Sequence, residues 1–216
     1  MSQPWMLEAC RCAGVRRGVF VSTTSLFTRL SSRTKPIRVA AEEAIRASGL
    51  EWTILRPTMI YGTERDRNMC RLVRHLARWP VMFVAGSGSS LQQPVHVEDL
   101  ARSIVASVFL REAIGREYNL SGKRPLTFNE VIDTTARALG RRVPRLHVPL
   151  RPVARVLALQ EKLTSRPFLR AEQVLRLEED KAFPHEAAAS DLDFAPRDFE
   201  EGIRGEVERM RSLKLV

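Results

Sequence analysis

The chain has 216 residues, of which 44% are hydrophobic and 28% charged, so it is long enough to bury one hydrophobic core. Its formal charge is +10, but the arginines are spread along every segment and the aromatic residues do not alternate with them, so no nucleic-acid surface is expected. No apolar run reaches the length of a bilayer span and the start MSQPWMLEAC lacks the order of a secretion signal, so no integral membrane protein is expected.

The first part of the chain alternates helices and strands. A helix is predicted over residues 4–14, where Gly14 ends it, and the strand GVFVS follows at 18–22. A second helix runs from residue 35 or 36 to 48, and the strand EWTILR follows at 51–56. Strands that are apolar on both faces, joined through helices, predict an α/β fold with a parallel sheet.

Two amphipathic helices are predicted next, over residues 66–79 and 97–110. A short strand at 81–86 and a loop at 87–93 should separate them. The apolar residues expected to face the core are Met69, Leu72, Val73 and Leu76 in the first helix, and Leu100, Ile104, Val105 and Val108 in the second.

The following segment carries a clear helix start. Thr127 and Glu130 have the spacing of a capping box, which predicts a helix that ends at Gly140. A strand is expected before it at 117–121, and an edge strand with a proline near each end is expected after it at 143–149.

Beyond residue 149 the pattern becomes mostly helical. Helices are predicted at 151–163 and 171–181, then a loop with Pro184 and an alanine run, and a last segment at 191–213. We therefore interpret residues 1–149 as a partial Rossmann-like and substrate-side region, and residues 150–216 as a helical cap of the same domain.

The three cysteines indicate reduced thiols. Cys10 and Cys12 lie one residue apart on a predicted helix and point to different faces, and Cys70 is far along the chain. This pattern favours neither a disulfide framework nor a metal site, and it predicts a cytoplasmic protein.

Five segments occur together in one order: GVRRGVFVSTTS, RVAAEEAIRASGLEWTILRPTMIYG, QPVHVEDLARSIVASV, EYNLSGKRPLTFNEV and DLDFAPRDFEEGI. In this order and spacing the chain resembles the C-terminal two-thirds of the NAD-dependent epimerase/dehydratase-like proteins, which are extended or atypical short-chain dehydrogenases. The branch includes nucleotide-sugar epimerases and a complex I accessory subunit. The resemblance implies a truncated Rossmann-like parallel sheet with flanking helices and a C-terminal helical cap.

The resemblance also implies NAD or NADP as cofactor, held at a GxxGxxG turn after the first strand. That signature is absent here, and the pair Gly86 and Gly88 in AGSGSS is typical of a turn. The family's order places roughly a hundred residues before Ser2, so the chain resembles a truncated copy or a mis-started reading frame, and dinucleotide binding by this chain alone is not expected.

The family's catalytic hydroxyl, Tyr and Lys map onto different residues in this chain. By resemblance, Thr24 is the substrate-facing hydroxyl, Ser22 contacts the cofactor, and Thr34 and Arg38 stand at the Tyr and Lys positions. An aliphatic hydroxyl is a poor general acid or base, and an arginine can hold a ribose or phosphate but cannot be tuned. The alternatives are a helix-capping Thr34 and a solvated Arg38.

The stretch LEWTILRPTMIYG supplies one wall of the implied pocket. By resemblance, Pro57, Thr58, Met59 and Ile60 contact the cofactor, and Arg56, Tyr61, Gln93 and His96 contact the substrate. Ligands of such sheets lie beyond the carboxyl ends of the strands, where Arg56 falls. The alternative is structural: Arg56 pairs with a helix acid, and Tyr61 packs under a loop.

Three functions remain open from the sequence. The first is an NAD(P)-dependent epimerase, dehydratase or reductase acting on a small molecule such as a nucleotide sugar. The second is a non-catalytic dinucleotide-binding or assembly protein of the same fold, and the third is an anionic-surface binder that uses the helix at 151–163. Whether the chain is an enzyme stays undecided. The strand at 18–22 should present an open sheet edge that promotes self-association.

Overall fold

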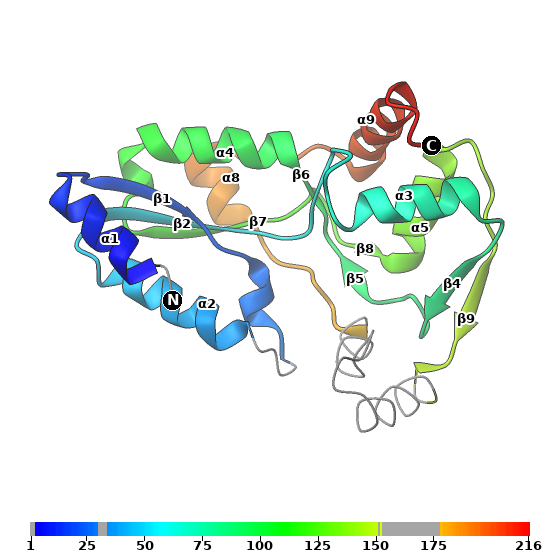
Figure 1. Cartoon of the computed structure of the whole chain (residues 1–216), viewed down its shortest axis with the longest axis horizontal. Helices are drawn as coiled ribbons and strands as arrows, with labels where there is room; N and C mark the ends of the chain where they lie inside the picture. Colours follow the sequence, from blue (N-terminus) through cyan, green and yellow to red (C-terminus); the bar gives the residue numbers. More distant parts are fainter. Residues whose placement is uncertain (1–2, 30–33, 151, 153–177) are drawn as a thin grey trace. The chain divides into compact units, whose positions relative to one another are not determined.

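A computed structural model describes residues 3–29, 34–150, 152 and 178–216 (Figure 1). The chain forms two compact units, each built from three separate stretches. Unit 1 consists of residues 1–60, 94–123 and 183–197, and unit 2 of residues 61–93, 124–182 and 198–216, within the limits of the described residues.

A parallel sheet forms the centre of unit 1. Its strands are β1 (Arg17–Val21), β2 (Glu51–Pro57) and β7 (Arg116–Leu120), in the order β1-β2-β7. Val19 lies opposite Thr53 in the first pair, and Leu55 opposite Tyr118 in the second. The predicted α/β fold with a parallel sheet is confirmed.

Helices cover both faces of this sheet (Figure 1). They are α1 (Gln3–Cys12), α2 (Lys35–Arg46), α4 (Val97–Phe109) and α8 (Glu186–Leu192), with the 3₁₀ turns η1 (Thr24–Phe27) and η2 (Arg111–Ala113). Ile54 belongs to a core cluster with residues of α1 and α2, and its neighbour Leu55 to a cluster with residues of α4 and α8. Successive residues of a strand point to opposite faces, so β2 is buried on both sides.

The buried side of α4 differs from the sequence prediction. Val105 and Val108 are 57% and 45% exposed, whereas Ser103 and Ser107 are buried. The two serine hydroxyls donate to the carbonyl oxygens of Asp99 and Ser103, so their burial costs little and the small side chains can face the sheet. The alanine run expected in a loop forms α8, and Asp193 ends that helix at φ 51°, a left-handed position that favours glycine.

Unit 2 contains three helices among its described residues: α3 (Met69–Arg78), α5 (Phe128–Ala138) and α9 (Phe199–Ser212). Its short strands are β4 (Met82–Ala85) parallel to β9 (Arg145–Val148), and β5 (Leu91–Gln92) antiparallel to β8 (Leu126–Thr127). The capping box at α5 and the buried face of α3 are confirmed. The stretch predicted as a loop at 87–93 contains β5, because Leu91 and Gln92 pair with β8.

Two further short strands, β3 (Ile60–Tyr61) and β6 (Val95–His96), complete the described elements. In the part of the chain that the structure describes, no helix has the length and apolarity to cross a bilayer. The predicted helix at 151–163, and with it the proposed anionic-surface segment, lies outside the described residues apart from residue 152, as do residues 171–177.

Candidate functional site

The carboxyl ends of the three parallel strands in unit 1 are joined by hydrogen bonds. The Ser22 amide donates to the Leu55 carbonyl oxygen at 2.7 Å, and the Thr58 amide to that of Leu120 at 3.0 Å. The buried Thr24 hydroxyl donates to the Pro57 carbonyl oxygen at 3.3 Å. The structure therefore brings Thr24 and Pro57 into contact at the carboxyl ends of the strands.

Arg56 lies just inside this edge and is held by two carboxylates. Its Nε and Nη2 donate to Glu42 Oε1 and Oε2 at 2.9 and 2.5 Å, and Nη2 also lies 2.5 Å from Glu117 Oε2. Arg46 contacts the same two acids, Glu42 at 2.9 Å and Glu117 at 2.5 Å. Two arginines and two glutamates thus form one closed network, in which Arg56 pairs with the α2 acid as the structural alternative predicts.

The network keeps its acids ionised although they are largely withdrawn from water. Burial alone would raise the pKa of Glu42, but hydrogen bonds from Arg56 and Ser22 and the charges of the two arginines lower it overall. Burial also acts to raise the pKa of Glu117, but the hydrogen bonds and charges of the same two arginines lower it overall. The Arg56 guanidinium also lies over the Phe27 ring, 5.3 Å from its centroid.

The residues at the family's Tyr and Lys positions lie on an exposed surface. Thr34 is the N-cap residue of α2 without a side-chain capping bond, and Arg38 follows in the first turn. Lys35 is half-buried, and its Nζ donates to the Thr28 carbonyl oxygen at 2.7 Å. A role for Thr34 or Arg38 in catalysis therefore stays a prediction.

The predicted substrate residues are divided between the units. His96 belongs to unit 1, where its Nδ1 accepts the Glu98 amide at 3.3 Å and caps α4. Burial first, and then the charge of Arg197, lowers the pKa of His96, which agrees with a neutral ring that accepts a hydrogen bond. Tyr61 and Gln93 belong to unit 2, and both are buried.

Tyr61 packs in unit 2 against α9. Its ring centroid lies 5.3 Å from that of Phe199, and its hydroxyl oxygen would lie 2.1 Å from a Cβ added at Gly202. The packing partner is therefore a helix, where the structural alternative expected a loop.

Two side-chain pairs of unit 1 were not predicted from the sequence. Asp99, in the first turn of α4, accepts the backbone amide and the side chain of Arg197. Ser121, at the end of β7, donates to the Phe183 carbonyl oxygen at 2.8 Å, and His185 Nδ1 lies 2.8 Å from its oxygen. The Ser121 proton is thus already used, and the pair fixes the chain instead of activating a nucleophile. These partners are more than sixty residues apart, so no local spacing indicates them.

The described residues fit one part of a dinucleotide and not another. A hydroxyl-lined carboxyl edge of a parallel sheet suits the nicotinamide end. A pyrophosphate needs glycine amides opening at a helix start, and the described residues do not offer that arrangement. Gly86 and Gly88 have φ of 76° and 67°, and a Cβ at Gly88 would lie 2.3 Å from Asn129 Oδ1, so this turn packs against α5 as the turn interpretation predicts.

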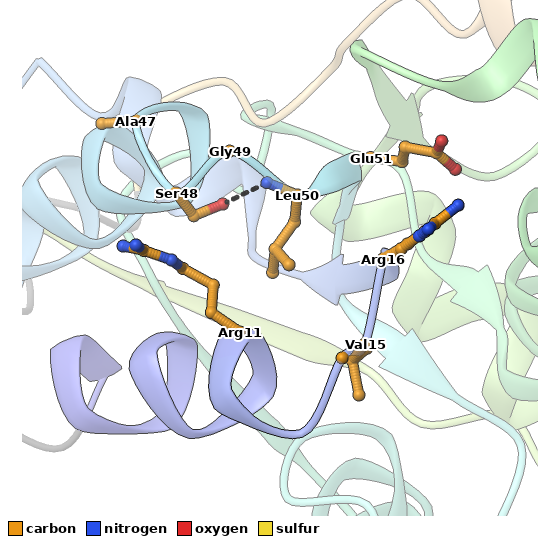
Figure 2. A pocket seen from close by; sticks show the side chains of 9 residues that line it. Arg11, Val15, Arg16, Ala47, Ser48, Gly49, Leu50 and Glu51 are labelled. Carbon is orange, nitrogen blue, oxygen red and sulfur yellow. Dashed lines mark hydrogen bonds between the residues drawn. The ribbon is translucent and has the colours of Figure 1, made fainter.

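A pocket of about 710 Å³ lies at the amino ends of strands β1 and β2, opposite the carboxyl ends that form the candidate site (Figure 2). It is bounded by the C-terminal ends of α1 and α2 and the N-terminal ends of β1 and β2, with Arg11, Arg16 and Glu51 among the lining residues. Helix C-termini repel anions, and the residues predicted for the cofactor lie at the other strand ends. This pocket is therefore separate from the candidate site.

Sequence comparison identifies the relatives of this chain. Residues 4–121 match the NAD dependent epimerase/dehydratase family. The mouse (Mus musculus) short-chain dehydrogenase/reductase family 42E member 1 is 30% identical over 193 residues, which cover 78% of this chain and 48% of that protein. The Arabidopsis thaliana protein NADH dehydrogenase (ubiquinone) 1 alpha subcomplex subunit 9, mitochondrial, is 29% identical over 192 residues, covering 86% and 46%. The chain thus spans about half the length of these relatives.

Solved structures agree with the observed fold. UDP-glucuronic acid 4-epimerase from Bacillus cereus, in complex with NAD, superposes with a TM-score of 0.75 at 16% identity, covering 99% of this chain and 67% of that one. UDP-glucose 4-epimerase from Thermotoga maritima, with UDP-glucose, gives 0.74 at 17% identity, covering 97% and 68%. At these identities the likeness shows a Rossmann-like fold.

Proposed function

Since the chain belongs to the NAD-dependent epimerase/dehydratase family, we propose that it contributes the nicotinamide-side and substrate-side part of an NAD(P)-dependent protein acting on a nucleotide-sugar-type substrate. The observation that carries the proposal is the carboxyl edge of the sheet, where the Thr24 hydroxyl meets the Pro57 carbonyl. The epimerase structures solved with NAD or with UDP-glucose lend support at the level of fold.

Residue roles follow from position at this edge. In the proposal, Ser22 and the stretch Pro57–Ile60 contact the nicotinamide end of the cofactor, and Thr24 accepts a hydrogen bond from the substrate. Thr34, Arg38, Arg56, Tyr61, Gln93 and His96 keep the roles predicted from the resemblance. Among these, Arg56 is held by two ion pairs, one with the buried Glu42 and one with the partly exposed Glu117.

Calorimetric titration of the chain with NAD⁺, NADH and NADP⁺ tests this proposal. We expect saturable binding that Thr24→Val weakens and Ser48→Ala does not, because Ser48 lies beside the pocket at the opposite edge of the sheet. Absence of binding at millimolar dinucleotide, or equal loss in both variants, would overturn the assignment. Turnover of UDP-glucose or UDP-glucuronic acid would distinguish an enzyme from a binding protein.

A non-catalytic assembly role is the second candidate. It is favoured by Thr34 and Arg38, which replace a tunable phenol and amine on an exposed helix start. The similarity to the Arabidopsis complex I subunit adds to it. Dinucleotide binding without turnover, unchanged in Arg38→Ala, is the result expected for this role, and turnover that Arg38→Ala abolishes would exclude it.

We also propose that copies of the chain associate through β1. Among the described strands β1 pairs with β2 alone, and the alternation of a parallel ladder leaves the N–H and C=O groups of Arg17, Val19 and Val21 pointing outward. An identical strand can pair with such an edge in the antiparallel sense, and Val21 is 52% exposed beside it. Analytical sedimentation should show a dimer that Val21→Lys disrupts. The control Val105→Lys, on α4, should leave the dimer intact. A monomer at every concentration would refute association through β1.

The cellular location stays a prediction. Cys10, Cys12 and Cys70, on which the cytoplasmic prediction rests, are free thiols in the structure. The similar Arabidopsis protein is named as mitochondrial, so imaging of a tagged chain has to decide between the two compartments.

A further inference from the structure

Unit 2 buries a carboxyl group that the proposed function does not use. Glu206 lies on the inner side of α9 and is 1% exposed. Its Oε2 accepts the Gly62 amide at 2.9 Å. Its Oε1 is also buried and has no hydrogen-bond partner among the residues that the structure describes. A buried carboxylate oxygen without a donor is costly, so this group requires an explanation.

The charged groups nearest to Glu206 are acids. Asp66 and Glu64 approach it from the loop of residues 62–68, and both act to keep it uncharged. Glu64 is paired with Arg209, 2.5 Å from Nε, so that arginine is engaged away from Glu206. Asp66 accepts the backbone amides of Asn68, Met69 and Cys70 at the start of α3, as a capping carboxylate does.

Among the described residues no basic side chain forms an ion pair with Glu206, although the charge of Arg74 on α3 acts on the neighbouring Cys70. On α3, the Cys70 thiol donates to the Glu64 carbonyl oxygen, and burial raises the pKa of that thiol. Helix α5 also packs against α9, and its buried residues are Val131, Ile132, Thr134, Thr135 and Ala136, which do not ionise. On α9 itself Arg209 is occupied by Glu64.

A proton on Glu206 resolves the missing contact. In its acid form Glu206 becomes a hydrogen-bond donor, and the side chain of Asp66 is within reach as the acceptor. Burial first, and then the charge of Asp66 and this hydrogen bond, raises the pKa of Glu206 to about 8. Glu64, a few residues from Asp66, behaves in the opposite way, since its bond to Arg209 lowers its pKa to about 2.

We propose that Glu206 carries a proton at neutral pH and donates it in a hydrogen bond to Asp66, which forms a pH-sensitive latch that holds the loop of residues 62–68 to α9 and loosens when Glu206 loses the proton. The folded state then binds a proton that the unfolded chain releases. Stability is therefore complete below the unfolded value of 4.5 and decreases as pH rises toward about 8. Within that window each pH unit raises the unfolding constant by at most about tenfold.

Glu206→Gln is the decisive variant. Its amide keeps an acceptor for the Gly62 amide and offers Asp66 a donor at every pH. In urea unfolding from pH 5 to 9, the unfolding constant of the wild-type chain should rise with pH, and that of Glu206→Gln should lack this rise. Glu64→Gln is the matched control: it removes a neighbouring carboxylate that is already ionised, so the rise should persist. An equal rise in wild type and Glu206→Gln overturns the latch.

Infrared spectroscopy of the wild-type chain tests the same point without a variant. A protonated carboxyl band should persist at pH 7 and disappear with a midpoint near 8. Amide exchange at residues 62–68, corrected for its intrinsic pH dependence, should accelerate over the same range. Absence of the band at pH 7 refutes the proposal, whether or not Glu206→Gln folds.

Discussion

Each unit buries a cluster of ionisable side chains, and the two clusters reach opposite charge states. In unit 1, Glu42 is 3% exposed and its pKa is lowered. In unit 2, Glu206 is 1% exposed and its pKa is raised to about 8. Burial disfavours both carboxylates in the same way, so burial does not decide the outcome.

The difference lies in the donors. Glu42 accepts bonds from Arg56, Arg46 and Ser22, whereas Glu206 accepts one backbone amide and faces the carboxylate of Asp66. A buried acid therefore stays charged where guanidinium groups surround it. It takes up a proton where its charged neighbour is a second acid. The following predictions test this comparison, from the largest expected effect to the smallest.

Removing the central arginine should have the largest effect. Arg56→Met leaves Glu42 buried with fewer donors, so the free energy of unfolding at pH 7 should fall by about 3–5 kcal/mol. Arg46→Met is the matched control, because Arg46 is 36% exposed, and its loss should cost about 1 kcal/mol or less. Urea unfolding measures both, and equal losses would contradict a dominant role for the buried arginine.

The packing of unit 2 can be tested on α9 without changing charge. A Cβ at Gly202 would lie 2.1 Å from the buried Tyr61 hydroxyl oxygen, so Gly202→Ala should destabilise by about 1–3 kcal/mol. Gly205, three residues on, has open space, and Gly205→Ala should stabilise the helix by about 0.5–1 kcal/mol. Thermal unfolding of the two variants should therefore shift in opposite directions.

Lowering the pH should reduce the stability that the unit 1 cluster provides, whereas raising the pH should reduce the stability that Glu206 provides. The pKa values of Glu42 and Glu117 are lowered, so their stabilisation is present above the unfolded value of 4.5 and is lost as pH falls below it. Glu117→Gln should flatten this loss by about 1 kcal/mol, because its side chain is partly exposed and solvent screens its pairs. Unfolding between pH 3 and 6 measures this effect. An unchanged acid slope would contradict it.

The smallest effect concerns a helix end in unit 1. Asp193 adopts φ 51° after α8, and its side chain is exposed. A residue with a side chain pays an energetic cost in the left-handed conformation, and Asp193→Gly removes this cost. The variant should therefore increase the free energy of unfolding by about 0.5–1 kcal/mol. Thermal unfolding checks the sign, and a destabilised variant would mean that the Asp193 carboxylate contributes more than its backbone costs.

Local patterns predicted most of the fold. The capping box at Thr127 and the apolar period of α3 depend on neighbours in sequence, and both were confirmed. The prediction for α4 was right for Leu100 and Ile104, which pack in the core, and wrong for Val105 and Val108, which hydrophobicity alone pointed inward. The hydroxyls of Ser103 and Ser107 bond within the helix, so the smaller residues face the sheet instead.

The sequence predicted the strand ends at which the candidate site is proposed, but few of the contacts found there. The strand end at Pro57 follows from the order of elements, and its contact with Thr24 agrees with the expected edge. The pairs Asp99–Arg197 and Glu206–Gly62 join positions about a hundred or more residues apart, for which one sequence contains no signal. The state of Glu206 depends on a neighbouring carboxylate that appears only once the chain has folded.

The three-part composition of unit 1 has a consequence for biosynthesis. Ala188, Leu192 and Phe194 complete a core cluster with Leu55 and Leu120, so its last members arrive near the end of the chain. Unit 1 cannot finish folding on the ribosome while residues 183–197 are still being made. Its apolar surfaces stay open meanwhile, and exposed apolar surface makes an incomplete chain prone to aggregation.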